Sequence, residues 1–323
     1  MTSVESTGYR PVRVPITYSV VICAYTMKRW PSLCRAVESI RHQDAPVHEI
    51  LVVIDHCEEL ERTAARHFES DPRVRVLTNR YERGLSGARN TGIEAAGGSV
   101  VAFLDDDACA DPSWYRVSAA HFADPNVLGV GGHARPSWPH TRPSWFPAEF
   151  DWVVGCSYVG QPDTVAPVRN FLGCSMAFRR EALEASDGFA LGIGRVGTLP
   201  TGCEETELCI RIAQHRSDAV LLLDPGMRVT HAVSPERTTF RYFLSRCYHE
   251  GTSKAVISGT VGPRDALSSE RSYTLHTLPR AVLRGLLSPR DGGVTRAAAV
   301  CAGLAVTAVG YVRGCLTLAK VTK

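Results

Sequence analysis

Apolar and polar residues alternate in two different patterns along the first half of the chain. Continuous runs of Val, Ile and Leu predict buried strands at residues 18–24, 49–54, 74–77 and 99–104. Between these runs, apolar residues recur every three or four positions, which predicts helices within residues 31–42, 58–70 and 86–98. Strands that alternate with amphipathic helices are typical of βαβ units. We therefore predict an α/β fold with a mostly parallel sheet that helices cover on both faces.

The second half of the chain is less regular. Residues 131–170 are rich in Pro and Trp and keep no period, so we predict a long, ordered loop. Ahead of this loop, Asp111 is expected to cap a helix that has Pro112 in its first turn. Helical spacing returns at residues 203–215, and an apolar run at residues 219–223 predicts another strand.

Positive charge is concentrated at the C-terminal end. The 323 residues carry a net charge of +3, yet residues 236–323 contain 13 Lys and Arg against 5 Asp and Glu. Such a segment favours an anionic partner, either phospholipid headgroups or a phosphorylated substrate, with a solvated basic helix face as the alternative. The basic residues lack a motif that reads bases, so we predict no nucleic-acid partner.

The basic segment contains one uncharged apolar stretch, residues 297–312, between Arg296 and Arg313. Its 16 residues are fewer than the ~18–20 that span a bilayer, and its Ala and Gly make it only mildly hydrophobic. We therefore predict an interfacial or buried helix rather than a membrane span.

The cysteines and the N-terminus indicate a compartment. Eleven Cys occur without a C-x-x-C pair or zinc-finger spacing, which is typical of reduced thiols. Residues 1–20 contain no continuous apolar stretch of the kind that a secretory signal needs. We expect a cytoplasmic protein, peripheral on the inner face of the plasma membrane where the basic segment binds lipid.

Polar residues follow the predicted strands at the edge of the sheet where ligands usually bind. They are Tyr25, Thr26, Asp55, Asn79 and the run Asp105, Asp106 and Asp107. Three adjacent carboxylates repel one another, and a divalent cation carrying a diphosphate would offset that repulsion. Oxygen ligands favour Mg²⁺ or Mn²⁺, so we predict such a site here; a solvated acidic turn is the alternative.

Six segments, taken in order, resemble glycosyltransferase family 2, the inverting nucleotide-sugar transferases of the GT-A fold. They are VVICAYTMKRW, EILVVIDHC, GLSGARNTGIEAAGG with Asn79 ahead of it, VVAFLDDDA, GCSMAFRRE and GCEETELCIRI. The resemblance covers roughly residues 18–250. The segments SWFPAEFDWVVGCSYVG and VRNFLGCSMAFRR further resemble a bacterial and archaeal subgroup of hexose and hexuronic acid transferases, which act on lipid-linked or small-molecule acceptors.

The resemblance implies a division of the chain into four parts. Residues 1–17 would be an N-terminal tail, and residues 18–130 the half of the GT-A domain that binds the nucleotide-sugar. Residues 131–235 would be the acceptor-binding half, and residues 236–323 a basic helical extension at the membrane surface.

The resemblance also implies a nucleotide site. Tyr25 would lie against the nucleobase, and Asp55 would accept a hydrogen bond from its imide N–H, with helix capping as the alternative role for Asp55. Arg89 would lie near the base or the diphosphate, or else pack on the loop from a helix surface. The implied nucleotide-binding residues are Tyr25, Thr26, Asp55, Asn79, Arg89, Asp105 and Asp106.

The metal would be held by the family's D-x-D motif, which Asp105 and Asp107 match. Asp107 would contact Mn²⁺ or Mg²⁺ directly, and Asp105 would contact the metal or the ribose. His231 would be a further metal ligand or a structural histidine. Such a metal neutralises charge on the departing nucleoside diphosphate.

The base that activates the acceptor hydroxyl would be Glu204 or Glu205, at the N-terminus of a predicted helix. The family usually has Glu–Asp there with the Asp as base, and Glu205 holds that second position. Trp145, Ser175 and Arg179 would contact the sugar or the acceptor. Core packing is the alternative for the tryptophan, and a helix start for Arg179.

We therefore predict an inverting, metal-dependent glycosyltransferase that moves a sugar from a nucleoside-diphosphate donor, with UDP favoured, to a lipid-linked or small-molecule hydroxyl acceptor. A nucleotidyltransferase is one alternative, although VVICAYTMKRW lacks the glycine-rich loop that would hold a triphosphate. A membrane-surface binding protein without activity is the other alternative.

Overall fold

The computed structural model describes residues 16–194, 202–289 and 292–321. Most of the predicted tail, residues 1–15, lies outside the described residues.

A single mixed sheet of nine strands runs through the described residues. The strands are β1 (Tyr18–Ala24), β2 (Glu49–Ile54), β3 (Val74–Thr78), β4 (Val100–Asp105), β5 (Ala108–Ala110), β6 (Val127–Ser137), β7 (Ala166–Pro167), β8 (Ser175–Arg179) and β9 (Val220–Ala232). Their order is β3-β2-β1-β4-β8-β6-β9-β5, and β7 pairs with β9. The first four strands in this order are parallel, β8 is antiparallel to β4 and β6, and β6 is parallel to β9. The predicted α/β fold with a mostly parallel sheet is confirmed.

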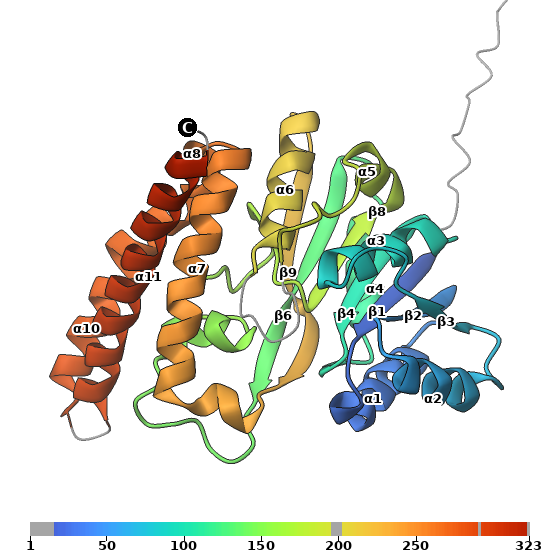
Figure 1. The fold of residues 1–323 in the computed structure, drawn as a ribbon, viewed down its shortest axis with the longest axis horizontal. Coiled ribbons are helices and arrows are strands. Elements are labelled where there is room, and N and C mark those ends of the chain that lie inside the picture. The colour runs from blue at the N-terminus through green and yellow to red at the C-terminus, as the bar shows by residue number, and fades with distance from the viewer. Residues whose placement is uncertain (1–15, 195–201, 290–291, 322–323) are drawn as a thin grey trace, which may run out of the picture.

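Helices cover both faces of the sheet and form an additional layer at one side of the molecule (Figure 1). The α-helices are α1 (Trp30–Arg41), α2 (Glu58–Phe68), α3 (Leu85–Ala95), α4 (Trp114–His121), α5 (Arg180–Ala185), α6 (Glu204–His215), α7 (Phe240–Thr260), α8 (Pro263–Ala266), α9 (Ser268–Ser272), α10 (Leu278–Leu287) and α11 (Gly293–Val321). Short 3₁₀ turns are η1 (Met27–Arg29), η2 (Ala148–Val154) and η3 (Pro235–Thr238), and η4 (Tyr273–Thr277) is a π turn.

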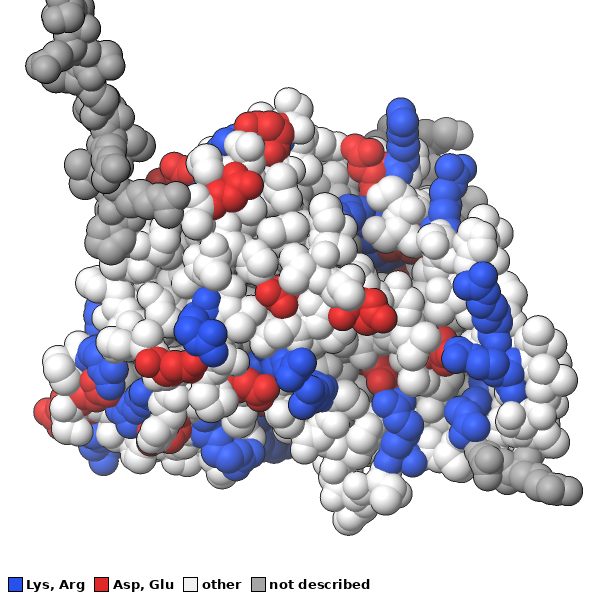
Figure 2. Space-filling model, turned by 180° about the vertical axis from the view of Figure 1, so that it is seen from behind, with Lys and Arg blue, Asp and Glu red and all other residues white. Residues whose placement is uncertain are grey.

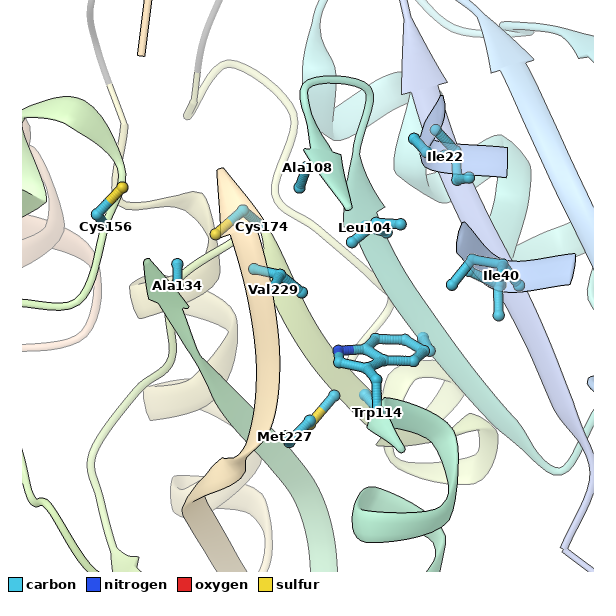
Figure 3. Packing of buried hydrophobic residues seen from close by; sticks show 14 of the residues in the cluster. Ile22, Ile40, Leu104, Ala108, Trp114, Ala134, Cys156, Cys174, Met227 and Val229 are labelled. Atoms are coloured by element: carbon cyan, nitrogen blue, oxygen red, sulfur yellow. The ribbon is translucent and has the colours of Figure 1, made fainter. Parts of the chain in front are cut away.

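The continuous apolar strands are explained by a core on each face of the sheet. Ile22 of β1 packs in one core, whereas its neighbour Val21 packs in the other, since successive side chains of a strand point to opposite faces. Trp114 is fully buried beside Leu104 and Met227 (Figure 3). Its indole N–H donates to Oγ of Ser175 at 3.0 Å, which satisfies a donor that would be costly to bury alone.

Two local predictions are corrected by the sheet. Asp111 does not cap a helix with its side chain: α4 begins at Trp114, and the Asp111 N–H donates to the carbonyl of Arg228. The reason is the short strand β5, which pairs with β9 and keeps the chain extended up to this point. The predicted loop of residues 131–170 is also shorter, because β6 continues to Ser137 beside β9.

The C-terminal helix α11 is longer than the predicted stretch of residues 297–312, since Arg296 and Arg313 continue the helix instead of bounding it. Its residues Gly293–Ala319 are long and apolar enough to cross a membrane by length and composition, a test that core helices of soluble proteins also pass. The helix packs along α7 through glycines on both partners. A Cβ on Gly310 would lie 2.1 Å from the Tyr248 carbonyl oxygen, and one on Gly251 would lie 2.0 Å from that of Thr307.

We expect Gly251→Ala to destabilise the protein, because its methyl group would force α7 and α11 apart at a backbone contact. Overpacking of this kind costs roughly 1–3 kcal/mol. Gly259→Ala is the matched control on the same helix, because its Cβ would meet nothing closer than Leu318 at 3.8 Å. That change should be neutral or stabilising by up to about 1 kcal/mol. Equal urea-unfolding midpoints for the two variants would contradict this description of the α7–α11 contact.

Candidate active site

A pocket opens at the carboxyl ends of β1, β2 and β4. Parallel pairing brings these ends into register, so that Cys23 lies opposite Asp105 and Ala24 opposite Ile54. The pocket thereby brings together four residues that the sequence predicted for a nucleotide site. It is lined by Cys23, Ala24, Tyr25, Arg29, Asp55, Leu85, Ala88, Asp105 and Asp106.

Two other predicted nucleotide residues support this edge of the sheet. Nδ2 of Asn79 donates to Asp55 Oδ1 at 2.7 Å, while the Gly84 N–H donates to Asp55 Oδ2 at 3.0 Å. Asn79 therefore positions the Asp55 carboxylate from behind. Oγ1 of Thr26 accepts a hydrogen bond from the N–H of Lys28 and caps η1, which follows β1 directly.

Asp105, Asp107 and His231 form a cluster whose ligand atoms all lie within 4.8 Å of one another. Asp105 ends β4, Asp107 lies in the turn that follows, and His231 reaches the cluster because β9 pairs with β5 at Ala108. Oδ1 of Asp107 lies 3.1 Å from Nε2 of His231, and both side chains are almost completely buried. Two carboxylates and an imidazole whose ligand atoms lie this close together are a donor set that fits a divalent cation such as Mn²⁺.

Positively charged side chains around the acids shift the pKa values in this cluster. Burial opposes ionisation of Asp107, yet His231, 3.1 Å away, and Arg29 lower the pKa of this carboxyl well below its usual range. Burial alone would lower the pKa of His231, but Asp107 raises it to about 10. Asp106 is different, because burial raises its pKa to about 7 despite the Arg29 guanidinium beside it.

Two arginines in the site were missed by the sequence analysis. Nη1 of Arg29 lies 2.7 Å from Asp106 Oδ1 and 3.1 Å from Asp107 Oδ2, and its guanidinium lies over the Tyr25 ring at 5.7 Å from the centroid. Nη1 of Arg237, in η3, lies 3.9 Å from Asp107 Oδ2. Proximity of Arg29 to the end of the first strand was an available signal. No sequence pattern indicated Arg237, because the turn η3 that brings it close to Asp107 has no regular spacing of apolar residues.

Arg89 connects the acids of β4 to the N-terminus of α6. It is buried, with Nη1 at 2.9 Å from Glu204 Oε1 and Nη2 at 3.5 Å from Asp105 Oδ1. Glu204 is therefore held in a buried ion pair. Glu205 is partly exposed, and its carboxylate accepts a long 3.4 Å hydrogen bond from Thr206 Oγ1. Burial and the neighbouring Glu204 raise the pKa of Glu205 to about 8.

The residues predicted to contact sugar or acceptor are not gathered at the pocket. Arg179 pairs with Val100 at the opposite end of β4 and donates to the carbonyl oxygens of Val127 and Phe122, so its predicted contact with the sugar or acceptor is wrong. Its alternative role, a helix start, is confirmed, because Arg179 directly precedes α5. Ser175 is fully buried and accepts from Trp114, which corrects its predicted contact with the sugar. Trp145 packs edge-on against Phe240 and Phe243, and its role as an acceptor platform stays a prediction.

Solved structures of glycosyltransferases have a similar fold. PcManGT, a mannosyltransferase from Pyrobaculum calidifontis in complex with GDP-Man and Mn²⁺, has a TM-score of 0.58 at 18% identity, covering 92% of this chain and 88% of its own. GalNAc-T7 with UDP, GalNAc and Mn²⁺ has a TM-score of 0.55 at 18% identity, and the match covers 82% of this chain and 57% of that chain. The architecture is thus that of GT-A glycosyltransferases.

Sequence comparison gives the family. Residues 19–186 match Glycosyl transferase family 2. The glucosyl-dolichyl phosphate glucuronosyltransferase of Haloferax volcanii is 33% identical over 240 residues, which are 74% of this chain and 76% of that protein. WfgD of Escherichia coli, a UDP-Glc:alpha-D-GlcNAc-diphosphoundecaprenol beta-1,3-glucosyltransferase, is 34% identical over 89 residues, 28% of this chain and 34% of its own. The chain belongs to glycosyl transferase family 2 and transfers sugar from a nucleotide-sugar donor, which excludes the two alternatives to a glycosyltransferase.

Proposed function

We propose that the protein transfers a hexose or hexuronic acid from a UDP-sugar to a sugar carried on a polyprenyl phosphate, with inversion at the anomeric carbon and with Mn²⁺ or Mg²⁺. The single observation that carries the proposal is the Asp105–Asp107–His231 cluster beside the pocket that Tyr25 and Asp55 line. The lipid-linked acceptor is supported by two relatives whose names state dolichyl phosphate or diphosphoundecaprenol acceptors.

The donor would be held by residues on both sides of the acids. Tyr25 offers an aromatic face for the base, and Asp55 an acceptor for its imide. Arg29 and Arg237 approach Asp107 from separate elements, η1 and η3, and would contact the diphosphate with their guanidinium groups. A cation bound to Asp105, Asp107 and His231 would offset the charge that develops on the leaving nucleoside diphosphate.

The acceptor hydroxyl would be activated by Glu205. Its raised pKa makes it a stronger base than an ordinary carboxylate, and the ion pair with Arg89 holds Glu204 in place next to it. As the acceptor oxygen attacks the anomeric carbon, its proton passes to Glu205 and the bond to the diphosphate oxygen breaks. A single displacement of this kind inverts the configuration.

The test is transfer from defined donors to a polyprenyl-phosphate glucose, with and without Mn²⁺, read by mass spectrometry. We expect a UDP-sugar, with UDP-glucuronate and UDP-glucose as the first two donors, to extend the acceptor only when metal is present. Transfer from GDP-mannose alone would contradict the UDP assignment. Extension of a free glucoside but not of the lipid-linked one would contradict the acceptor.

Arg237→Ala is expected to weaken binding of the nucleoside diphosphate by about 10- to 100-fold, because a hydrogen bond between charged groups contributes roughly 1.5–3 kcal/mol. Isothermal titration with UDP and Mn²⁺ measures the change. Arg180→Ala is the control, since Arg180 forms an exposed pair with Glu184 beyond the opposite end of β4. Equal affinities for the two variants would remove Arg237 from the donor site.

A further inference from the structure

The helices beyond the catalytic sheet expose large apolar side chains. Around α10, Leu287 is 73% exposed, and Leu275, Leu283 and Leu286 are also well exposed. Leu283, Leu286 and Leu287 belong to α10, whose buried residues, among them Ala281 and Gly285, face the protein. Exposed leucines scattered singly need no explanation, but several on one short helix indicate a contact surface.

The neighbouring helix α11 continues this exposure over its whole length. Val294, Leu304, Val309, Val312 and Leu316 are exposed. Since α11 has 29 residues, its exposed side is about 40 Å long. We call the exposed apolar residues of α10 and α11 together the outer apolar surface: Leu283, Leu286, Leu287, Val294, Leu304, Val309, Val312 and Leu316.

Four exposed arginines of the C-terminal helices lack an acidic partner among the described residues. Arg264, Arg271, Arg280 and Arg313 are exposed and form no ion pair with any described residue. The nearby acid Glu270 is already paired with Arg169 and Lys254. Figure 2 shows basic side chains along the side of the molecule that the C-terminal helices form. An apolar face with arginines beside it is complementary to an anionic lipid surface.

The packing of α11 against α7 favours a position on the membrane surface over a span across the membrane. Its glycines contact the backbone of α7 at Gly251 and Tyr248, so the two helices move together. On α7, Arg246, Glu250 and Lys254 form buried ion pairs, and Lys254 continues the network to Glu270. A helix bound to such a charged neighbour cannot enter the hydrocarbon core without carrying these charges with it.

We propose that the outer apolar surface docks onto an anionic phospholipid bilayer, with α10 and α11 lying in the plane of the interface. This proposal deepens the proposed function, because a lipid-linked acceptor would be presented at the same membrane surface. It rests on the proposed function in that one respect.

Contacts connect this surface to the wall of the active site. Arg284 of α10 pairs with Glu149 at 2.6 Å, and Trp152 donates to the Tyr273 hydroxyl, so η2 is held by the docking helices. Just after η2, a Cβ on Gly155 would lie 3.2 Å from His231. His231 of the metal cluster is therefore connected through η2 to α10 and to Tyr273.

The experiment is co-sedimentation of the full chain with phosphatidylglycerol vesicles and with phosphatidylcholine vesicles, followed by washes with high salt and with alkaline carbonate. The test variant is Leu283→Ser/Leu286→Ser/Leu287→Ser. The control is Val159→Ser/Val165→Ser, two exposed apolar residues outside the C-terminal helices. Light scattering gives the oligomeric state, and a thermal shift with UDP and Mn²⁺ reports folding and donor binding in every variant.

We expect the wild type and the control to bind phosphatidylglycerol vesicles and to be released by carbonate, and the triple variant to bind about tenfold or more weakly while still responding to UDP. Equal binding by the triple variant and the wild type would overturn the proposal, as would resistance to carbonate, which indicates a span. A wild-type dimer that the triple variant dissociates would assign the surface to a second copy of the chain. If UDP has no effect on wild type that binds vesicles, the proposed function fails and the docking stands.

Discussion

Asp107→Asn is expected to lower kcat/KM for sugar transfer by about 1,000-fold. The substitution keeps the shape of the side chain but removes a carboxylate whose pKa is held well below the usual range, and with it a charge that a divalent cation needs. Metal stabilisation of a leaving group contributes several kcal/mol, and about 4 kcal/mol corresponds to a factor of roughly 1,000. Transfer rates at saturating Mn²⁺ measure the loss.

Asp106→Asn is the comparison that makes this result specific. Asp106 is adjacent in sequence and equally buried, but it is outside the cluster of Asp105, Asp107 and His231 and pairs with Arg29 instead. Its loss should reduce kcat/KM by roughly tenfold, the scale of one charge-assisted hydrogen bond. Equal losses for the two variants, or more than a tenth of the activity left in Asp107→Asn, would contradict a metal role for Asp107.

Glu205→Gln is expected to lower kcat by about 100- to 10,000-fold with little change in donor affinity, because general base catalysis contributes on that scale. The pH dependence follows from the raised pKa of about 8. A base acts when it is deprotonated, so kcat/KM of the wild type should rise about tenfold per pH unit below pH 8 and level off above it. In Glu205→Gln, this rise should disappear from the residual rate.

Glu204→Gln separates the two acids. Removing its charge leaves Arg89 buried with a weaker partner, and breaking a buried ion pair costs roughly 3–5 kcal/mol. We therefore expect a large fall in the unfolding midpoint for this variant, and an almost unchanged midpoint for Glu205→Gln. A fully active Glu205→Gln together with an inactive but stable Glu204→Gln would reverse the assignment of the base.

The sequence predicted the nucleotide half of the fold because parallel strands carry a strong local signal. Runs of consecutive apolar residues identify β1, β2 and β4, and the carboxyl ends of parallel strands meet at one edge of the sheet. Tyr25, Asp55 and Asp105 could therefore be assigned to one pocket from the strand pattern alone.

The wrong predictions concern residues whose position depends on the direction of a strand or on a long-range pairing. The family resemblance implied that Arg179 contacts the sugar or acceptor, but β8 is antiparallel to β4, which puts Arg179 at the other end of the sheet. Asp111 has good capping chemistry, yet pairing of β5 with β9 keeps it extended. Arg237 reaches Asp107 only through the turn after β9. Local sequence patterns contain no information on these three pairings.

The most direct test of the central claim is the thermal shift of the wild type and Asp107→Asn with UDP, GDP or dTDP, each with and without Mn²⁺. A ligand at about 100 times its Kd adds about 2.7 kcal/mol of stability, which is readily measured. The metal site and the pocket of Tyr25 and Asp55 predict that UDP stabilises the wild type only with Mn²⁺, and that Asp107→Asn loses this response. Stabilisation of the wild type by none of the three nucleotides, or an undiminished shift in Asp107→Asn, would contradict a metal-dependent donor site at this edge.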